Sequence, residues 1–456
     1  WKEASVVVDR TVPISLACIL TQSLPLISLI SIGHLGKEAL ASAALGNLII
    51  AVTGHAVVTG AGSAVDTLCS QAYGSDQKDH PLFGDALGSG GHLMRGAMAM
   101  TILTILLAFP WCFGVEWTLS HLTSHPPEII TMTGVFVRWT TPGLWPMAMF
   151  ELARRYFQAQ GYMAMGTWVL VLVLPFHLIL NWALVWWSPL AIGFIGAPLA
   201  TSLSQWACFL LSLVYGWRMC GYEPYIPDHS SSFSSSPLLS PWTIGTAGVM
   251  LICMEWWAFE VVTYLSGVLG VVALASQAIL ISLTTILFSI PQGLAASTSA
   301  RVGNLLGAQK PWEARMAAWT ALAIGAGTSL ISCIALYLLR IPIAWAYSRD
   351  VEVIHALETL IPIIAIFQLG DGMNNVVTSV MQGAGKQALT GWLNGLCYYL
   401  LALPFGIALA FPLGLGLDGL WFGLLVGVSL LAMTLIGLVY RMDWVREAQL
   451  CLRVES

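Results

Sequence analysis

The chain has very few charged residues. Asp, Glu, Lys and Arg make up 9% of its 456 residues, whereas a soluble domain carries about 25%. A surface that faces water cannot be built from so few charges. The formal net charge of -5 gives no reason to expect a nucleic-acid partner. The 9 cysteines are scattered without a CxxC pair, so they indicate neither a metal site nor a disulfide framework.

Apolar residues dominate instead. They form 57% of the chain, and the mean hydropathy is +0.79. Residues 156–217, 261–300 and 387–417 contain no Asp, Glu, Lys or Arg. A transmembrane helix needs about 20 apolar residues, and a membrane barrel would instead show alternation in segments of about 10. The composition therefore predicts an all-α integral membrane protein.

The apolar runs and the breaks between them predict twelve transmembrane helices. A Ser- and Pro-rich insert at residues 224–241 reads as a cytoplasmic linker between an N-lobe, residues 1–223, and a C-lobe, residues 242–456. Each lobe then holds six spans. The spans are expected at residues 14–32, 40–65, 93–114, 129–150, 164–186, 192–216, 244–268, 272–298, 316–338, 353–380, 388–411 and 416–439.

The two lobes repeat each other in sequence. Three short matches recur in the same order with offsets of 234, 229 and 224 residues, which predicts two pseudo-symmetric lobes with the same orientation. The matched pairs are residues 39–45 with 273–279, 174–176 with 403–405, and 158–161 with 382–385. With both termini in the cytoplasm, 14 of the 18 Lys and Arg residues fall on the cytoplasmic side, as the positive-inside rule requires.

Three acidic residues fall within the predicted spans. Glu255 and Glu260 belong to the seventh span and Asp371 to the tenth, and no Lys or Arg lies near them in sequence. A charged side chain in the hydrocarbon core of the membrane is energetically costly, so such a residue usually has a structural or functional role. The two glutamates point about 140° apart on a helix. Either the three groups are hydrogen-bonded anchors between helices, or they bind and release protons and attract cations.

Other residues complete a candidate cavity. The aromatic rings of Trp256, Phe259 and Phe288 are available to bind an organic cation, although rings in a membrane protein also pack between helices or line the membrane interface. Gln22 and Asn374 either line the cavity or hydrogen-bond between helices.

Asp66 and Arg301 occupy nearly equivalent places in the two repeats. Opposite charges at such positions predict a cytoplasmic gate that closes when the two side chains pair.

At these residues the sequence resembles the multidrug and toxic compound extrusion (MATE) family, most closely its eukaryotic branch. The likeness runs from about residue 12 to residue 440. Its specific motifs are Met-Glu-Trp-Trp-Ala-Phe-Glu at residues 254–260, Arg-Val-Gly-Asn-Leu-Leu-Gly-Ala at 301–308, Gly-His-Leu-Gly-Lys at 33–37 and the segment 66–75. The resemblance implies a V-shaped molecule that exports organic cations in exchange for protons.

The resemblance also implies roles for single residues. Glu255 and Glu260 stand where the family has its paired glutamates, and Asp371 stands where mammalian members have Glu and plant members Asp. The positions of Gln22, Trp256, Phe259 and Phe288 line the central cavity of mammalian relatives. Gln368 replaces a mammalian histidine, and Phe259 and Phe288 replace tyrosines. These changes alter the expected range of substrates.

We therefore expect a proton-coupled antiporter for organic cations or other xenobiotics that works by alternating access. Protons and substrate would compete for the C-lobe carboxylates. The chain is expected to be a monomer without metal or cofactor, not an enzyme, in the plasma membrane or alternatively the vacuolar membrane. A sodium-coupled exporter, a flippase for lipid-linked substrates and a membrane sensor are the alternatives.

Overall fold

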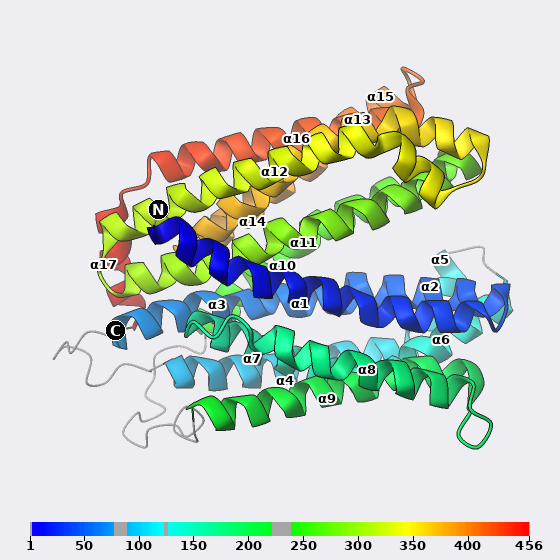
Figure 1. The fold of residues 1–456 in the computed structure, drawn as a ribbon, viewed down its shortest axis with the longest axis horizontal. Coiled ribbons are helices and arrows are strands. Elements are labelled where there is room, and N and C mark those ends of the chain that lie inside the picture. Colours follow the sequence, from blue (N-terminus) through cyan, green and yellow to red (C-terminus); the bar gives the residue numbers. More distant parts are fainter. Residues whose placement is uncertain (1, 77–88, 123–125, 221–238, 456) are drawn as a thin grey trace. The chain divides into compact units, whose positions relative to one another are not determined.

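The computed structural model describes residues 2–76, 89–122, 126–220 and 239–455, and these ranges contain helices and no strand (Figure 1). The helices group into two compact units. We name Leu16–Val249 the N-unit, and residues 2–15 together with Met250–Val454 the C-unit. Most of the expected linker, residues 224–241, lies outside the described residues.

The division between the units falls inside two helices rather than in the linker. Both α1 (Lys2–Gly33) and α10 (Leu239–Leu269) begin in one unit and end in the other. The prediction had placed the span at residues 14–32 entirely in the N-lobe and the span at 244–268 entirely in the C-lobe. A long helix can pack its two halves against different neighbours, and this is a property that span counting does not detect.

The remaining helices overlap the predicted spans, except that α5 and α17 correspond to none of them. In the N-unit they are α2 (Lys37–Ile50), η1 (Ala51–His55), α3 (Ala56–Asp76), α4 (Ser89–Phe113), α5 (Val115–Leu122), α6 (Pro127–Thr140), η2 (Thr141–Gly143), α7 (Leu144–Ala159), α8 (Met165–Val185), η3 (Gly193–Ile195) and α9 (Gly196–Cys220). In the C-unit they are α11 (Val271–Gly307), α12 (Pro311–Tyr347), α13 (Val351–Gly383), α14 (Gln387–Gly395), η5 (Leu396–Ala402), α15 (Leu403–Ala410), α16 (Gly416–Tyr440) and α17 (Trp444–Glu455).

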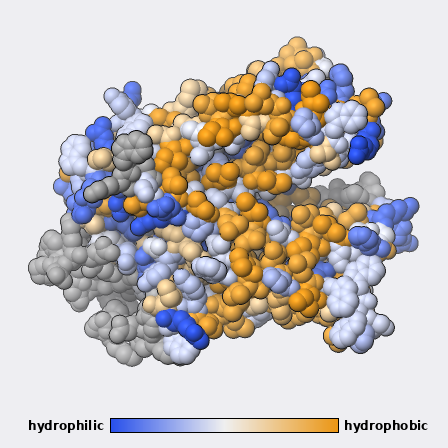
Figure 2. Space-filling model, in the orientation of Figure 1, coloured by the Kyte–Doolittle hydropathy of each residue, from blue (hydrophilic) through white to orange (hydrophobic). Residues whose placement is uncertain are grey.

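Eleven helices in the described ranges are long and apolar enough to cross a membrane. The remaining predicted span, residues 129–150, corresponds to α6, η2 and α7, which are interrupted at Thr141–Gly143. Pro142 in this turn has no amide hydrogen, so the regular helical hydrogen bonding is broken there. Figure 2 shows hydrophobic residues over the visible sides of the helices and hydrophilic residues at their ends, as expected for membrane-spanning helices.

Glycines with positive φ recur at equivalent points of the two repeats. Gly36, before α2, has φ 139°, and Gly270, before α11, has φ 126°. Gly161 and Gly385 follow the same pattern after α7 and α13, with φ 92° and 75°. Residues other than glycine rarely adopt this backbone conformation. The repeat read from the sequence is therefore also present in the backbone of the turns.

Each unit contains a very close helix crossing at a glycine in a corresponding part of the repeat. In the N-unit, a Cβ on Gly60 of α3 would lie 2.5 Å from the Cα of Val249 on α10. In the C-unit, a Cβ on Gly293 of α11 would lie 2.8 Å from the backbone nitrogen of Ser15 on α1. Only glycine leaves room for such backbone approaches.

The short helix α17 covers one end of the C-unit (Figure 1). The Nζ of Lys386, in the turn before α14, lies 2.8 Å from the Oε1 of Glu447 on α17. Gln309, in the turn before α12, donates a hydrogen bond from Nε2 to the carbonyl oxygen of Ala448. These two contacts fix α17 to the turns at this end of the helices.

Candidate functional site

Two of the three predicted acidic residues lie near each other inside the C-unit. The carboxyl groups of Glu255 on α10 and Asp371 on α13 lie close enough to interact electrostatically. Asp371 is only 5% exposed, and Glu255 is partly buried. In the described ranges, no salt bridge involves Glu255, Glu260 or Asp371. The structure therefore brings two carboxyl groups together without a cationic side chain to neutralise them.

Glu260 occupies a different position on the same helix. It is partly buried on α10, five residues after Glu255, and its side chain points about 140° away. No interaction between Glu260 and the other two acids is recorded in the described part of the chain. The structure thus separates an acid pair from a third acid that stands alone.

Two polar residues beside the acid pair were not anticipated from the sequence. The Asn394 side chain of α14 lies within hydrogen-bonding reach of Glu255, and its Nδ2 also donates to the carbonyl oxygen of Leu251 at 3.2 Å. Tyr398 interacts electrostatically with both acids. Asn394 is a polar residue within a charge-free run, and this signal alone could have identified it from the sequence.

The local backbone positions Tyr398 for this contact. It belongs to η5, a π-helical segment between α14 and α15. A π-helical segment adds a residue to the turn and rotates the side chains that follow, and such segments are frequent at functional sites. Asn394 and Tyr398 thereby face the acid pair from one continuous stretch of chain.

Several buried polar atoms around the pair have no protein partner in the described ranges. These atoms are the Nε2 and Oε1 of Gln368, the Oδ1 atoms of Asn374 and Asn394, and the hydroxyl oxygen of Tyr398. Buried polar groups are normally hydrogen-bonded. These atoms are therefore available to water or to a bound solute. The structure assigns Gln368 and Asn374 to α13 with Asp371, and both are nearly completely buried.

The three predicted aromatic residues differ in their surroundings. The Phe259 ring packs against Phe367, Tyr398 and Trp421, with centroid distances of 6.0, 6.4 and 6.3 Å. It therefore belongs to an aromatic cluster inside the C-unit. Trp256 on α10 and Phe288 on α11 are partly buried, and no ring contact is recorded for either among the described residues.

The remaining predicted residues lie on other helices. Gln22 is exposed on α1 in the N-unit. Asp66, on α3 of the N-unit, is buried and interacts electrostatically with Arg154. Arg301, on α11 of the C-unit, forms a salt bridge with Glu3 at 2.8 Å. The gate between Asp66 and Arg301 stays a prediction.

Comparisons with known proteins agree over nearly the whole chain. A model of the MatE family matches residues 13–183 and 249–408. An uncharacterized transporter of Schizosaccharomyces pombe is 32% identical over 441 residues, which cover 95% of this chain and 78% of that protein. Multidrug and toxin extrusion protein 2 of Oryctolagus cuniculus is 32% identical over 460 residues, which cover 98% of this chain and 72% of that protein. The crystal structure of the eukaryotic MATE transporter AtDTX14 is similar with a TM-score of 0.87 and 28% identity, covering 99% of this chain and 98% of that one.

Proposed function

This chain belongs to the MATE family of transporters, and we propose that it is a proton-coupled antiporter that exports organic cations. The acid pair of Glu255 and Asp371 carries this proposal. Its carboxyl groups lie together inside the C-unit, and no basic side chain pairs with them in the described ranges. The multidrug and toxin extrusion protein of Oryctolagus cuniculus supports the cargo class by its name.

The physical basis of exchange is the repulsion between two neighbouring carboxylates. When both are ionised, they repel each other in a medium of low dielectric constant, where charges interact strongly. A proton on one of them or a nearby cation relieves this repulsion. Because a proton and a cation relieve the same repulsion, each weakens the binding of the other, and this competition is the thermodynamic condition for exchange.

The neighbouring residues have distinct roles in this scheme. Asn394 donates a hydrogen bond to the ionised form of Glu255, and the buried amides of Gln368 and Asn374 provide hydrogen bonds to water or substrate. Trp256 and Phe288 offer ring faces to an organic cation. Glu260 provides a third negative charge for attracting cations.

The transport cycle follows from the competition. Protons from outside bind to the acid pair and release the cation outward. The lobes then rearrange, the protons leave on the cytoplasmic side, and the ionised pair takes up another cation. One pH unit corresponds to about 1.4 kcal/mol per proton. A one-for-one exchange can therefore accumulate a cation about tenfold per pH unit.

Proteoliposomes with imposed ion gradients test the proposal. A radiolabelled quaternary ammonium ion is added outside vesicles with an acidic lumen, with and without a sodium gradient. We expect the pH gradient to drive uptake of the cation, and we expect the same uptake with and without the sodium gradient. Uptake that needs sodium would favour a sodium-coupled exporter, and movement of labelled lipid alone would favour a flippase. Binding of the cation without flux under any gradient would favour a sensor.

The membrane and the orientation belong to the same proposal. We place the protein in the plasma membrane, with the vacuolar membrane as the alternative, and both termini in the cytoplasm. The distribution of Lys and Arg supports this orientation. The pseudo-symmetric pair of units within one chain supports a monomer as the working form.

A further inference from the structure

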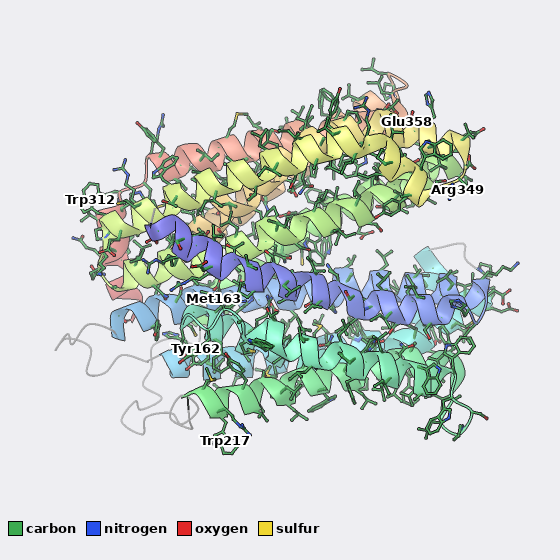
Figure 3. The ribbon with its side chains drawn as sticks, viewed as in Figure 1. Tyr162, Met163, Trp217, Trp312, Arg349 and Glu358 are labelled. Carbon is green, nitrogen blue, oxygen red and sulfur yellow. The ribbon has the colours of Figure 1, made fainter. Side chains whose placement is uncertain are left out.

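An open depression lies on the C-unit at the beginning of α12. It has a volume of about 420 Å³ and is lined by Trp312, Arg315, Met316, Trp319 and Thr320. Trp312, labelled in Figure 3, lies at the same end of the C-unit as α17. The side chains of Trp312 and Met316 are 66% and 64% exposed. The depression therefore combines one cationic group with apolar and aromatic walls.

The guanidinium of Arg315 is available for a ligand. Its Cζ lies 5.8 Å from the ring centroid of Trp312, which holds it by a cation–π contact. No hydrogen bond or ion pair of Arg315 is recorded in the described ranges. Its nearest acidic neighbour in sequence, Glu313, is bound to Lys310, with 3.3 Å between Oε1 and Nζ. No unpaired carboxylate on this first turn of α12 would repel an anion.

The residues around the depression are of types typical of the membrane–water interface. Trp319 packs edge-on against Tyr440 at the end of α16, with 6.3 Å between the ring centroids. Arg441, a second basic residue, follows Tyr440 directly. Trp and Tyr collect at the membrane–water interface, and arginines at the cytoplasmic side attract anionic lipids.

From this combination of charge and aromatic walls, and resting on the proposed orientation with both termini in the cytoplasm, we infer that the depression binds the headgroup of an anionic phospholipid of the cytoplasmic leaflet. Arg315 binds the phosphate, the rings of Trp312 and Trp319 flank the glycerol region, and Met316 contacts the first methylene groups of an acyl chain. The site lies on the outer surface of the C-unit and is separate from the acid pair.

The opposite end of α12 provides a matched control. Arg340 also lies over an aromatic ring, with its Cζ 4.5 Å from the centroid of Tyr337. Its NH1, however, already donates a hydrogen bond to the carbonyl oxygen of Tyr337 at 3.0 Å. Both arginines lie on α12, and each makes a cation–π contact with an aromatic ring. Among the described residues, Arg340 has a hydrogen-bond partner for its guanidinium and Arg315 does not.

Native mass spectrometry of the detergent-purified protein tests the inference. The wild type, Arg315→Gln and Arg340→Gln are titrated with phosphatidylserine or with phosphatidylcholine of the same acyl chains. We expect the wild type to prefer phosphatidylserine, and Arg315→Gln to bind it about fivefold more weakly, since one basic residue near an anionic surface contributes about that factor. Arg340→Gln should bind as the wild type does.

A second variant and a competitor complete the test. Trp312→Ala, at a strongly exposed position that leaves the core intact, should also weaken the binding of phosphatidylserine. Millimolar inorganic phosphate should not displace the lipid, because the apolar walls contribute to binding. Equal retention of the two lipids, equal losses in the two arginine variants, or displacement by free phosphate would overturn the inference. Transport activity does not enter any of these measurements.

Discussion

Arg301 of α11 binds Glu3 of α1 through two hydrogen bonds. Its Nε donates to Oε1 at 2.8 Å, and its NH2 donates to Oε2 at 3.1 Å. Both side chains are about one quarter exposed. Thr11 and Ser297 add a contact between the same two helices, with 3.2 Å between their hydroxyl oxygens. The first turns of α1 are thereby attached to α11 within the C-unit.

This ion pair predicts a measurable coupling between Glu3 and Arg301. We expect Glu3→Gln and Arg301→Gln each to lower the thermal stability of the purified protein, and the double variant to lose less than the sum. Charge-assisted hydrogen bonds that are partly buried predict a coupling of about 1–2 kcal/mol. A double-mutant cycle measured by thermal unfolding gives this number directly. Strict additivity would show that the pair does not stabilise the C-unit.

The sequence identified Arg301 as functionally interesting but assigned it another partner. It was matched with Asp66 because the repeat places the two residues at equivalent points. Glu3 has no counterpart in any motif, and only the folded chain reveals that the start of α1 lies along α11. Contacts between segments almost 300 residues apart depend on tertiary packing, which short-range patterns do not encode.

The glycine crossings predict opposite effects for two similar substitutions. Gly293→Ala should destabilise the protein, because the new methyl group would lie within 2.8 Å of the Ser15 backbone nitrogen. Overpacking of this kind costs about 1–3 kcal/mol. Gly327→Ala on α12 meets nothing within 4 Å. It should stabilise the helix by up to about 1 kcal/mol, since alanine is the better helix former.

Thermal unfolding of the two alanine variants in detergent checks this contrast. The melting temperature should fall for Gly293→Ala and stay level or rise for Gly327→Ala. Gly60→Ala, at the corresponding crossing in the N-unit, should behave as Gly293→Ala does. A Gly293→Ala protein as stable as the wild type would mean that the crossing opens without cost.

A buried hydrogen bond between Gln277 and Trp421 predicts a further stability effect. The Nε1 of Trp421 donates to the Oε1 of Gln277 at 2.8 Å, and both residues are fully buried. Trp421→Phe should cost about 1–3 kcal/mol, because it leaves a buried acceptor unsatisfied. Combining it with Gln277→Leu removes the acceptor as well, so the double variant should be more stable than Trp421→Phe. The ranking of the melting temperatures decides the outcome.

Asn394 predicts an effect on transport. Asn394→Leu keeps the volume but removes the donor beside Glu255, so we expect cation uptake to fall about tenfold, the value of one hydrogen bond to a charged group. Thr434→Val is the matched control, since the exposed Thr434 hydroxyl bonds to the carbonyl oxygen of Leu430 in its own helix at 2.8 Å. Initial uptake rates in proteoliposomes compare the two. Equal rates in both variants would separate Asn394 from the transport site.

The sequence was most informative where one physical cause dominates. Long charge-free runs have no other stable form in lipid than helices, so the membrane class and the helical fold were predicted and are confirmed by the similarity to MATE structures. Residues 129–150 were expected as a span. The 3-10 turn at Thr141–Gly143 within this stretch was not predicted, because hydropathy does not detect a local change of helix type.

Side-chain neighbours were harder to predict. Glu255 and Asp371 were singled out because a charge in lipid is costly, but their closeness depends on tertiary packing. Phe259 was expected either beside a cation or packed between helices; its ring contacts lie within an aromatic cluster, and a contact with a cation stays a prediction. Tyr398, in the π-helical segment η5, lies in a charge-free run and had no sequence signal that linked it to the acid pair.

The most direct test is uptake of a quaternary ammonium ion into proteoliposomes under an imposed pH gradient, with acid-pair variants compared to a surface variant. Glu352→Gln, at an exposed site in the first turn of α13, serves as the surface variant. We predict that Glu255→Gln and Asp371→Asn each abolish gradient-driven uptake, while Glu352→Gln transports at the wild-type rate. Wild-type uptake by both acid-pair variants, in folded protein of equal amount, would contradict the central role of the pair.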